Sequence, residues 1–134
     1  MKPASLEHVN ITVKDPKKTA AILCKIFDWH VRWEGASMDN GYTVHVGSEE
    51  SYIALYSTGT PKPSQTPSYK TIAALNHIAL TVDDLESAEK RVLAAGFETE
   101  NHGDYEPGRR FYFRDDDNVE YEIVSYSKTQ DLGR

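Results

Sequence analysis

Cysteine, positive charge and long apolar runs are all scarce in this chain of 134 residues. The single cysteine, Cys24, excludes an internal disulfide and fits a reducing cytoplasm. A net charge of -6 disfavours nucleic acid and anionic membranes, because both select for clustered Lys and Arg. No stretch is long enough to span a bilayer, and residues 1–5 carry no apolar signal core. We therefore expect a cytoplasmic protein that binds small molecules, with no nucleic acid and no membrane as partner.

The first half of the chain predicts one strand, one helix and three further strands. Residues 6–13 alternate strictly, so their aliphatic side chains face one way and His8 faces the other. Asp15-Pro16 is a helix start, followed by apolar residues at helical spacing as far as about Asp28. Three runs separated by turn-forming residues then read as strands: Trp29–Glu34, Gly41–Val46 and Tyr52–Ser57.

The second half repeats this order. Residues 75–82 alternate like the opening strand, and His77 stands where His8 stood. A helix is predicted after Asp84, with Gly96 as its left-handed stop. The strands expected after it are Phe97–Glu100, Arg109–Arg114 and Val119–Tyr126.

The duplication predicts one α+β domain spanning residues 1–134. We expect two βαβββ modules, because paired modules can close a shared concavity that neither would form alone. This gives a cupped, barrel-like mixed sheet. The expected parts are a first module at about 5–57, a Pro-rich linker at about 58–73, a second module at about 74–126 and a tail at 127–134.

Two symmetric histidines and a carboxylate suggest a metal site. His8 and His77 face away from the aliphatic stripes of their strands, and imidazole is a common transition-metal ligand. Alternation in the last strand puts Glu120 and Glu122 on one face. Such a set leaves coordination positions open and suits Fe(II), Mn(II), Ni(II) or Zn(II). The simpler interpretation is that each histidine only satisfies a sheet edge or forms a hydrogen bond with a neighbour.

Three segments, 77–85, 94–97 and 111–122, resemble the vicinal oxygen chelate superfamily. It includes glyoxalase I, bleomycin-resistance proteins, methylmalonyl-CoA epimerase, fosfomycin-resistance enzymes and extradiol dioxygenases. The resemblance implies the paired βαβββ fold, and it implies that His8, His77 and Glu122 bind a divalent metal.

The chain departs from the family pattern at two points. The usual Asp-Pro-Asp-Gly-Asn turn reads Asp115–Val119, with Asn118 in place of glycine because Asn tolerates the left-handed conformation. In the first module, the position equivalent to Glu122 falls on Leu55, so a fourth protein ligand is missing. Glyoxalase I and the epimerase use four ligands, whereas extradiol dioxygenases use two His and one Glu.

Other residues are candidates for chemistry at this site. His45 and Tyr112 fall at matching positions of the two modules, where each is a candidate for proton transfer or for supporting a ligand. With Glu122 they form our catalytic candidates. Arg109 and Arg110 are candidates for binding a carboxylate or phosphate of the substrate, although solvated arginines are equally common at a strand end.

We expect a divalent-metal-dependent enzyme that acts on a small oxygen-bearing substrate. Lyase activity of the glyoxalase kind and dioxygenase activity of the extradiol kind remain equal possibilities. One alternative is a metal-free protein that sequesters a small molecule or drug, as in bleomycin resistance. Another is a regulatory or structural member whose histidines bind nothing. The families that share this fold commonly form homodimers, so we also expect a homodimer.

Overall fold

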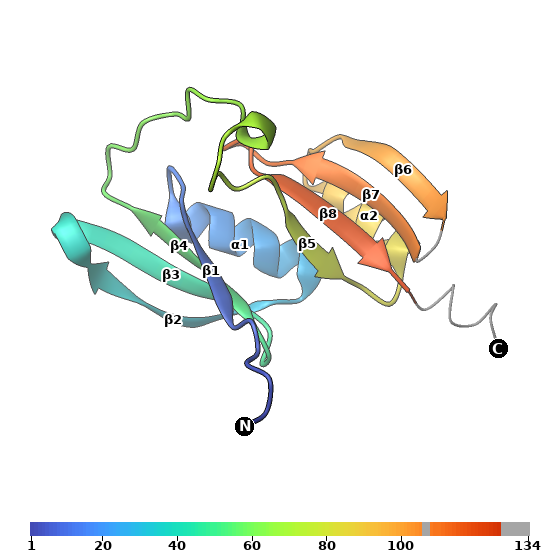
Figure 1. The fold of residues 1–134 in the computed structure, drawn as a ribbon, viewed down its shortest axis with the longest axis horizontal. Helices are drawn as coiled ribbons and strands as arrows, with labels where there is room; N and C mark the ends of the chain where they lie inside the picture. Colours follow the sequence, from blue (N-terminus) through green and yellow to red (C-terminus); the bar gives the residue numbers. More distant parts are fainter. Residues whose placement is uncertain (106–107, 127–134) are drawn as a thin grey trace. The chain divides into compact units, whose positions relative to one another are not determined.

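The computed structural model describes residues 1–105 and 108–126 of the chain, and the predicted tail at 127–134 lies outside them. The chain divides after Pro63 into two compact units. Each unit has its own four-stranded sheet and its own helix (Figure 1). In the described residues, no helix has the length and apolar character needed to cross a membrane.

The sheet of the first unit has the strand order β1-β4-β3-β2. β1 runs parallel to β4, and the remaining pairs are antiparallel. The elements are β1 (His8–Thr12), α1 (Pro16–Phe27), β2 (His30–Ser37), the 3₁₀ helix η1 (Met38–Asn40), β3 (Gly41–Gly47) and β4 (Tyr52–Ser57).

The sheet of the second unit repeats this topology in the order β5-β8-β7-β6. β5 is parallel to β8, and the other neighbours are antiparallel. The elements are the 3₁₀ helix η2 (Ser68–Lys70), β5 (Ile78–Thr81), α2 (Leu85–Ala94), β6 (Thr99–Tyr105), β7 (Gly108–Arg114) and β8 (Glu120–Ser125).

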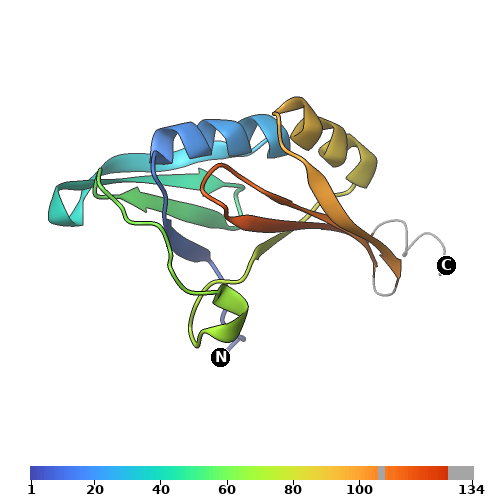
Figure 2. The same cartoon turned by 90° about the horizontal axis from the view of Figure 1, so that it is seen from above.

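The predicted α+β fold with two βαβββ modules is confirmed. The eight strands form two separate four-stranded sheets rather than one closed barrel, since no described strand of one sheet pairs with a strand of the other. In each unit the helix packs on one face of its own sheet (Figure 2). We call the opposite face of each sheet its open face.

Both helices begin at the residues that the sequence predicts. Asp15 caps α1 by accepting a hydrogen bond from the backbone N of Lys18, and Pro16 follows it at the first helical position. Asp84 caps α2 in the same way through Ser87 N. After α2, Gly96 has a φ of 97°, which confirms the predicted left-handed stop.

The turn between β7 and β8 also forms as expected. Asn118 has a φ of 64°, in the left-handed region that the sequence assigns to it. One carboxylate oxygen of Asp115 accepts from the backbone N of Asp117 and of Val119, and Asn118 N donates to Asp115 O. This turn fixes where β8 begins, and so fixes which face its glutamates occupy.

β2 and β6 run well past their predicted ends. β2 continues through Gly35 to Ser37, because the chain reverses later, at Asp39 and Asn40, both with a φ of 57°. β6 continues to Tyr105 past a register shift between Glu100 and Gly103. In both cases a turn residue in the sequence lies inside a strand rather than at its end.

Candidate functional site

The open face of the second unit is densely charged. Strand alternation buries Phe111, Phe113 and Tyr121 under α2. It sends most of the ionisable residues of β7 and β8 to the opposite face. We call the residues on this open face the charged face: His77, Arg110, Tyr112, Arg114, Glu120 and Glu122.

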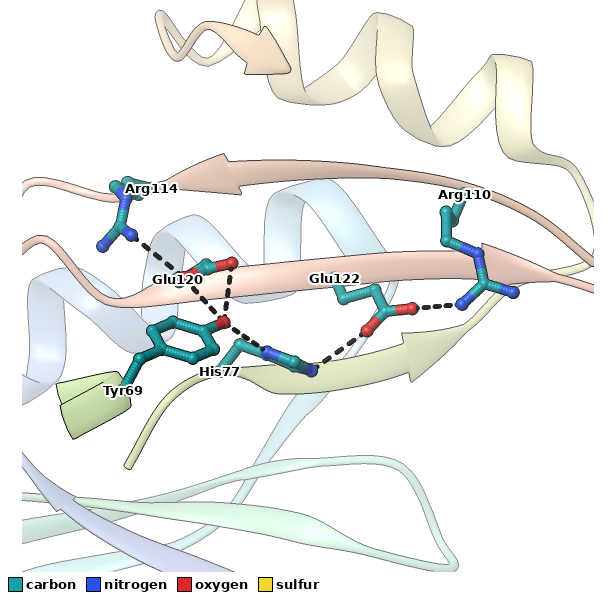
Figure 3. A network of polar contacts seen from close by, with 6 residues as sticks. All are labelled: Tyr69, His77, Arg110, Arg114, Glu120 and Glu122. Atoms are coloured by element: carbon teal, nitrogen blue, oxygen red, sulfur yellow. Dashed lines mark hydrogen bonds and ion pairs between the residues drawn. The ribbon is translucent and has the colours of Figure 1, made fainter. Parts of the chain in front are cut away.

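His77 and Glu122 point toward one another. His77 comes immediately before β5, and its Nε2 lies 3.0 Å from Oε1 of Glu122 on the neighbouring strand β8 (Figure 3). Arg110 on β7 donates from Nη1 to the other oxygen, Oε2, at 2.7 Å. The Glu122 side chain is only 10% exposed, and that of Arg110 12%. The carboxylate is therefore oriented by Arg110, with Oε1 turned toward the imidazole.

A second carboxylate lies beside this group. Glu120 accepts from Arg114 Nη2 at 2.9 Å and from the hydroxyl of Tyr69, which lies 3.3 Å from both of its oxygens (Figure 3). The same hydroxyl is 3.0 Å from Nδ1 of His77. Both ring nitrogens of His77 are thus in polar contact, one with Tyr69 and the other with Glu122.

Tyr112 lies directly beside the His77–Glu122 contact. It is in register with Glu122, and its ring meets that of His77 edge to face with centroids 5.9 Å apart. Burial, followed by the negative charge of Glu122, raises the pKa of the Tyr112 phenol. This predicted catalytic candidate therefore keeps its proton at neutral pH.

Arg109 lies apart from the charged face. It precedes Arg110 on β7, so its side chain leaves the sheet on the other side and pairs with Glu86 of α2. Of the two predicted substrate-binding arginines, only Arg110 lies with His77 and Glu122. Its Nε is buried and has no hydrogen-bond partner among the residues that the structure describes.

The open face of the first unit carries rings instead of charges. Four side chains form a row across the strands, which we call the ring row: Trp33, His45, Tyr52 and His8, with successive ring centroids 5.1, 4.6 and 4.8 Å apart. The Arg32 guanidinium lies 4.5 Å from the Tyr52 ring centroid. Trp33 is 50% exposed, so one end of the row is open to solvent.

The two predicted residues of the first unit both belong to the ring row. Nδ1 of His8 contacts Glu7 Oε1 at 2.9 Å. Burial, followed by the nearby His8, lowers the pKa of His45. His45 is therefore a neutral imidazole at pH 7, which is the form that a general base requires.

The position equivalent to Glu122 is Ala54, and the prediction of Leu55 was wrong by one residue. Ala54 is in register with Asn10 and His45, as Glu122 is with Ala79 and Tyr112. The error arose because the turn before β8, residues 115–119, is one residue longer than the turn before β4, residues 48–51. Alanine offers no ligand atom, so the predicted absence of a fourth ligand at this position holds.

The predicted metal ligands are distributed between the units. His77 and Glu122 meet in the second unit, whereas His8 belongs to the first. Within residues 1–105 and 108–126, no group of three or more His, Cys, Asp and Glu side chains is arranged to hold a metal ion.

Tyr69 is a site residue that the sequence did not reveal. It lies in the Pro- and Ser-rich stretch that we expected to be an extended connector, where η2 forms instead. The only signal was an aromatic residue isolated among small polar ones, which carries no specific meaning by itself. The contacts of Glu120 with Tyr69 and Arg114 were also not foreseen.

The chain belongs to the Glyoxalase/Bleomycin resistance protein/Dioxygenase superfamily, whose family model matches residues 5–123. This confirms the resemblance seen in the sequence. No curated protein sequence matches the chain.

Solved structures of the same fold include two fosfomycin resistance proteins. FosX from Listeria monocytogenes, complexed with Mn(II) and sulfate ion, is 23% identical with a TM-score of 0.72, and the match covers 98% of this chain and 99% of that one. FosX from Mesorhizobium loti is 24% identical with a TM-score of 0.71, covering 99% and 100%. A glyoxalase I mutant from Zea mays is 15% identical with a TM-score of 0.76, covering 96% of this chain and 48% of that one.

Proposed function

We propose that this protein is a divalent-metal-dependent enzyme acting on a small oxygen-bearing molecule, with His8, His77 and Glu122 as metal ligands. The observation that carries the proposal is the 3.0 Å contact between Nε2 of His77 and Oε1 of Glu122 on the open face of the second unit. The Mn(II) in the Listeria FosX structure supports it as a precedent in the same fold.

The donor atoms have suitable chemistry for such an ion. Imidazole nitrogen and carboxylate oxygen together suit Fe(II), Mn(II), Ni(II) or Zn(II). Arg110 holds Oε2 of Glu122 and so leaves Oε1 as the oxygen available to a cation. Glu122 lies within β8, and His77 directly precedes β5, so both side chains are held by the sheet of the second unit.

The bound ion would supply Lewis acidity toward vicinal oxygens of the substrate. Tyr112, beside Glu122, would donate a hydrogen bond to a developing oxyanion. His45 would serve as the base. Arg110, beside Glu122, would bind a carboxylate or another oxyanion of the substrate.

Elemental analysis of untagged protein tests the proposal. We expect about one divalent ion per chain, lost in His77→Ala, Glu122→Ala and His8→Ala. His30→Ala and Glu34→Ala are matched controls on β2, outside the proposed ligand set, and should keep the ion. Wild-type protein that takes up none of the four ions, or a His77→Ala variant with unchanged metal content, would show that the proposal is wrong.

Activity assays then separate the reaction classes. Oxygen consumption by the Fe(II)-loaded protein with a catechol would identify a dioxygenase. Turnover of a small oxygen-bearing substrate without oxygen consumption would identify lyase-type chemistry. Fosfomycin is a further trial substrate because of the two FosX structures that share this fold.

A metal-free sequestering protein is the second candidate, and the ring row favours it. Exposed Trp33 together with Tyr52 offers flat apolar surface to a planar ligand, with the Arg32 guanidinium alongside. Tight binding of an aromatic drug by metal-free protein, lost in Trp33→Ala and retained in Glu122→Ala, would select this function instead.

The homodimer and the cytoplasmic location stay predictions from sequence. Size-exclusion chromatography with light scattering tests the first. We expect a dimer at micromolar concentration, and a monomer alone would refute it.

A further inference from the structure

Tyr69 is held in place by a compact turn rather than by a sheet. Within and after η2, Lys70 N donates to Pro67 O, and Thr71 N donates to Ser68 O. The Thr71 hydroxyl also donates to Pro67 O at 2.7 Å, which closes the turn a second time. This turn holds a tyrosine that is 60% exposed as a residue while its hydroxyl reaches the charged face (Figure 3).

The Tyr69 hydroxyl meets three polar atoms but has only one proton. Its neighbours are Nδ1 of His77 at 3.0 Å and the two oxygens of Glu120 at 3.3 Å. An ionised carboxylate can only accept a hydrogen bond, whereas an imidazole nitrogen either donates or accepts according to its tautomer.

The direction of each hydrogen bond follows from the number of donors and acceptors around the Tyr69 hydroxyl. If the phenol donated to His77, its oxygen lone pairs would face the Glu120 carboxylate, and two acceptors would lie in contact. The Tyr69 proton therefore goes to Glu120, and the phenol oxygen accepts from Nδ1 of His77. On the other side of the ring, Nε2 and Oε1 of Glu122 are 3.0 Å apart, so a proton or a metal ion has to lie between these two atoms. Arg114 holds the far end of this chain by donating to Glu120 at 2.9 Å.

We propose that Tyr69 is a positioning residue that keeps a proton on Nδ1 of His77, so that Nε2, beside Glu122, is the nitrogen that binds the metal. This inference deepens the proposed function, on which it rests. A ligating histidine whose other nitrogen donates to a fixed acceptor has its tautomer and ring orientation set, and loss of such an acceptor typically weakens metal binding about 10–100-fold. The order of contacts is Arg114, Glu120, Tyr69, His77.

Zinc affinity of the full-length protein, measured by competition with a chelating dye, tests the proposal. We expect Tyr69→Phe to weaken Zn(II) binding about tenfold, since it removes only the hydroxyl. Tyr126→Phe, at a tyrosine outside this chain of contacts, should leave the affinity unchanged. Glu120→Gln should also weaken binding, and the double variant should be no weaker than the poorer single one, because both substitutions break the same chain.

Nitrogen-15 NMR of the histidine ring provides a reading that does not depend on metal. In metal-free wild-type protein, we expect the Nδ1 proton of His77 to exchange with water more slowly than in Tyr69→Phe. The role of Tyr69 would be overturned by equal exchange rates in the two proteins, or by a Zn(II) affinity of Tyr69→Phe within twofold of wild type. It would also be overturned if the double variant lost affinity by the product of the two single losses. Wild-type protein that binds no metal while the exchange rates differ would instead overturn the proposed function and leave the tyrosine contact standing.

Discussion

The two units share one topology but fill the space under their helices with different side chains. In the first unit aliphatic residues pack under α1, and the ring row lies on the open face. In the second unit the rings of Phe111, Phe113 and Tyr121 pack under α2, and the open face is mainly charged. The equivalent core pairs are Val44 and Phe111, Val46 and Phe113, and Ile53 and Tyr121.

The lengths of the helices account for the difference in the cores. α1 has 12 residues, whereas α2 has 10. The buried residues of α1 are Pro16, Thr19, Ala20, Leu23 and Ile26, and those of α2 are Leu85, Ala88 and Val92. A shorter helix with fewer buried side chains leaves more volume to fill, and interiors are packed to near-crystalline density. Larger side chains on β7 and β8 fill that volume. Once the cores differ in this way, the open faces are free to diverge for separate tasks.

The largest expected effect comes from removing an aromatic core residue of the second unit. Phe111→Ala should lower the free energy of unfolding by about 4 kcal/mol, because it leaves a large cavity under α2. The equivalent Val44→Ala should cost about 2 kcal/mol, since less apolar volume is lost. Urea titration followed by circular dichroism measures both. Equal losses would contradict the volume account.

The second test introduces the missing carboxylate into the first unit. Ala54 is 2% exposed, so Ala54→Glu should destabilise the protein by about 3 kcal/mol, because a buried charge would lack a partner. Thr43 occupies the position equivalent to Arg110, so adding Thr43→Arg should recover part of the loss. A double variant no more stable than the single one would show that the two open faces are not interchangeable in this respect.

The ring row is expected to make a smaller contribution. Tyr52→Leu should lower stability by about 1 kcal/mol, since it keeps most of the apolar area but loses ring contacts with His8 and His45. Trp33→Leu, at the open end of the row, should cost about half as much. If Trp33→Leu lowers the free energy of unfolding more than Tyr52→Leu does, the ring row is not stabilised by stacking between its members.

The smallest effect concerns a polar cluster that joins α2 to β6. Burial raises the pKa of the Glu89 carboxyl, but hydrogen bonds from Thr99 at 2.5 Å and from His102 at 2.6 Å outweigh it and hold this pKa below its ordinary value. A carboxyl with a lowered pKa stabilises the fold above its ordinary value of about 4.3 and loses that contribution as the pH falls.

We therefore expect Glu89→Gln to lower the melting temperature relative to wild type at pH 7, by an amount equivalent to about 0.5–1 kcal/mol. The difference should shrink as the pH falls below the lowered pKa of Glu89 and the carboxyl becomes protonated. A difference that grows on acidification would have the wrong sign for this cluster. The first unit has no equivalent pair in the part of the chain that the structure describes, so the effect is specific to the second unit.

Local patterns predicted most of the fold because they depend on a few neighbouring residues. The helix caps at Asp15 and Asp84, the stop at Gly96 and the left-handed Asn118 are all confirmed. The ends of β2 and β6 were less predictable, because Gly35 and Gly103 are accommodated within paired strands. Whether a glycine ends a strand or continues it depends on the partner strand, which the local sequence does not contain.

The candidate site was predictable only where strand alternation determined it. Alternation put His77 and Glu122 on one open face, and the structure brings these two side chains together. It could not reveal Tyr69, whose position depends on a turn closed by Thr71. It also gave no means of locating the one-residue difference between turns that makes Ala54, rather than Leu55, equivalent to Glu122. The ligand set that includes His8 stays a prediction.

The register shifts in β2 and β6 also affect how the protein behaves when it is concentrated. These strands lie at the ends of their sheets, and each is interrupted once: β2 between Val31 and Trp33, and β6 between Glu100 and Gly103. An irregular, charged edge strand is a poor template for a strand of another molecule. The backbone groups of the incoming strand cannot keep a regular hydrogen-bond register along it. Both edge strands should therefore resist pairing with a strand of another molecule, which is the step that begins amyloid growth. We expect this resistance also in protein without a bound metal or substrate.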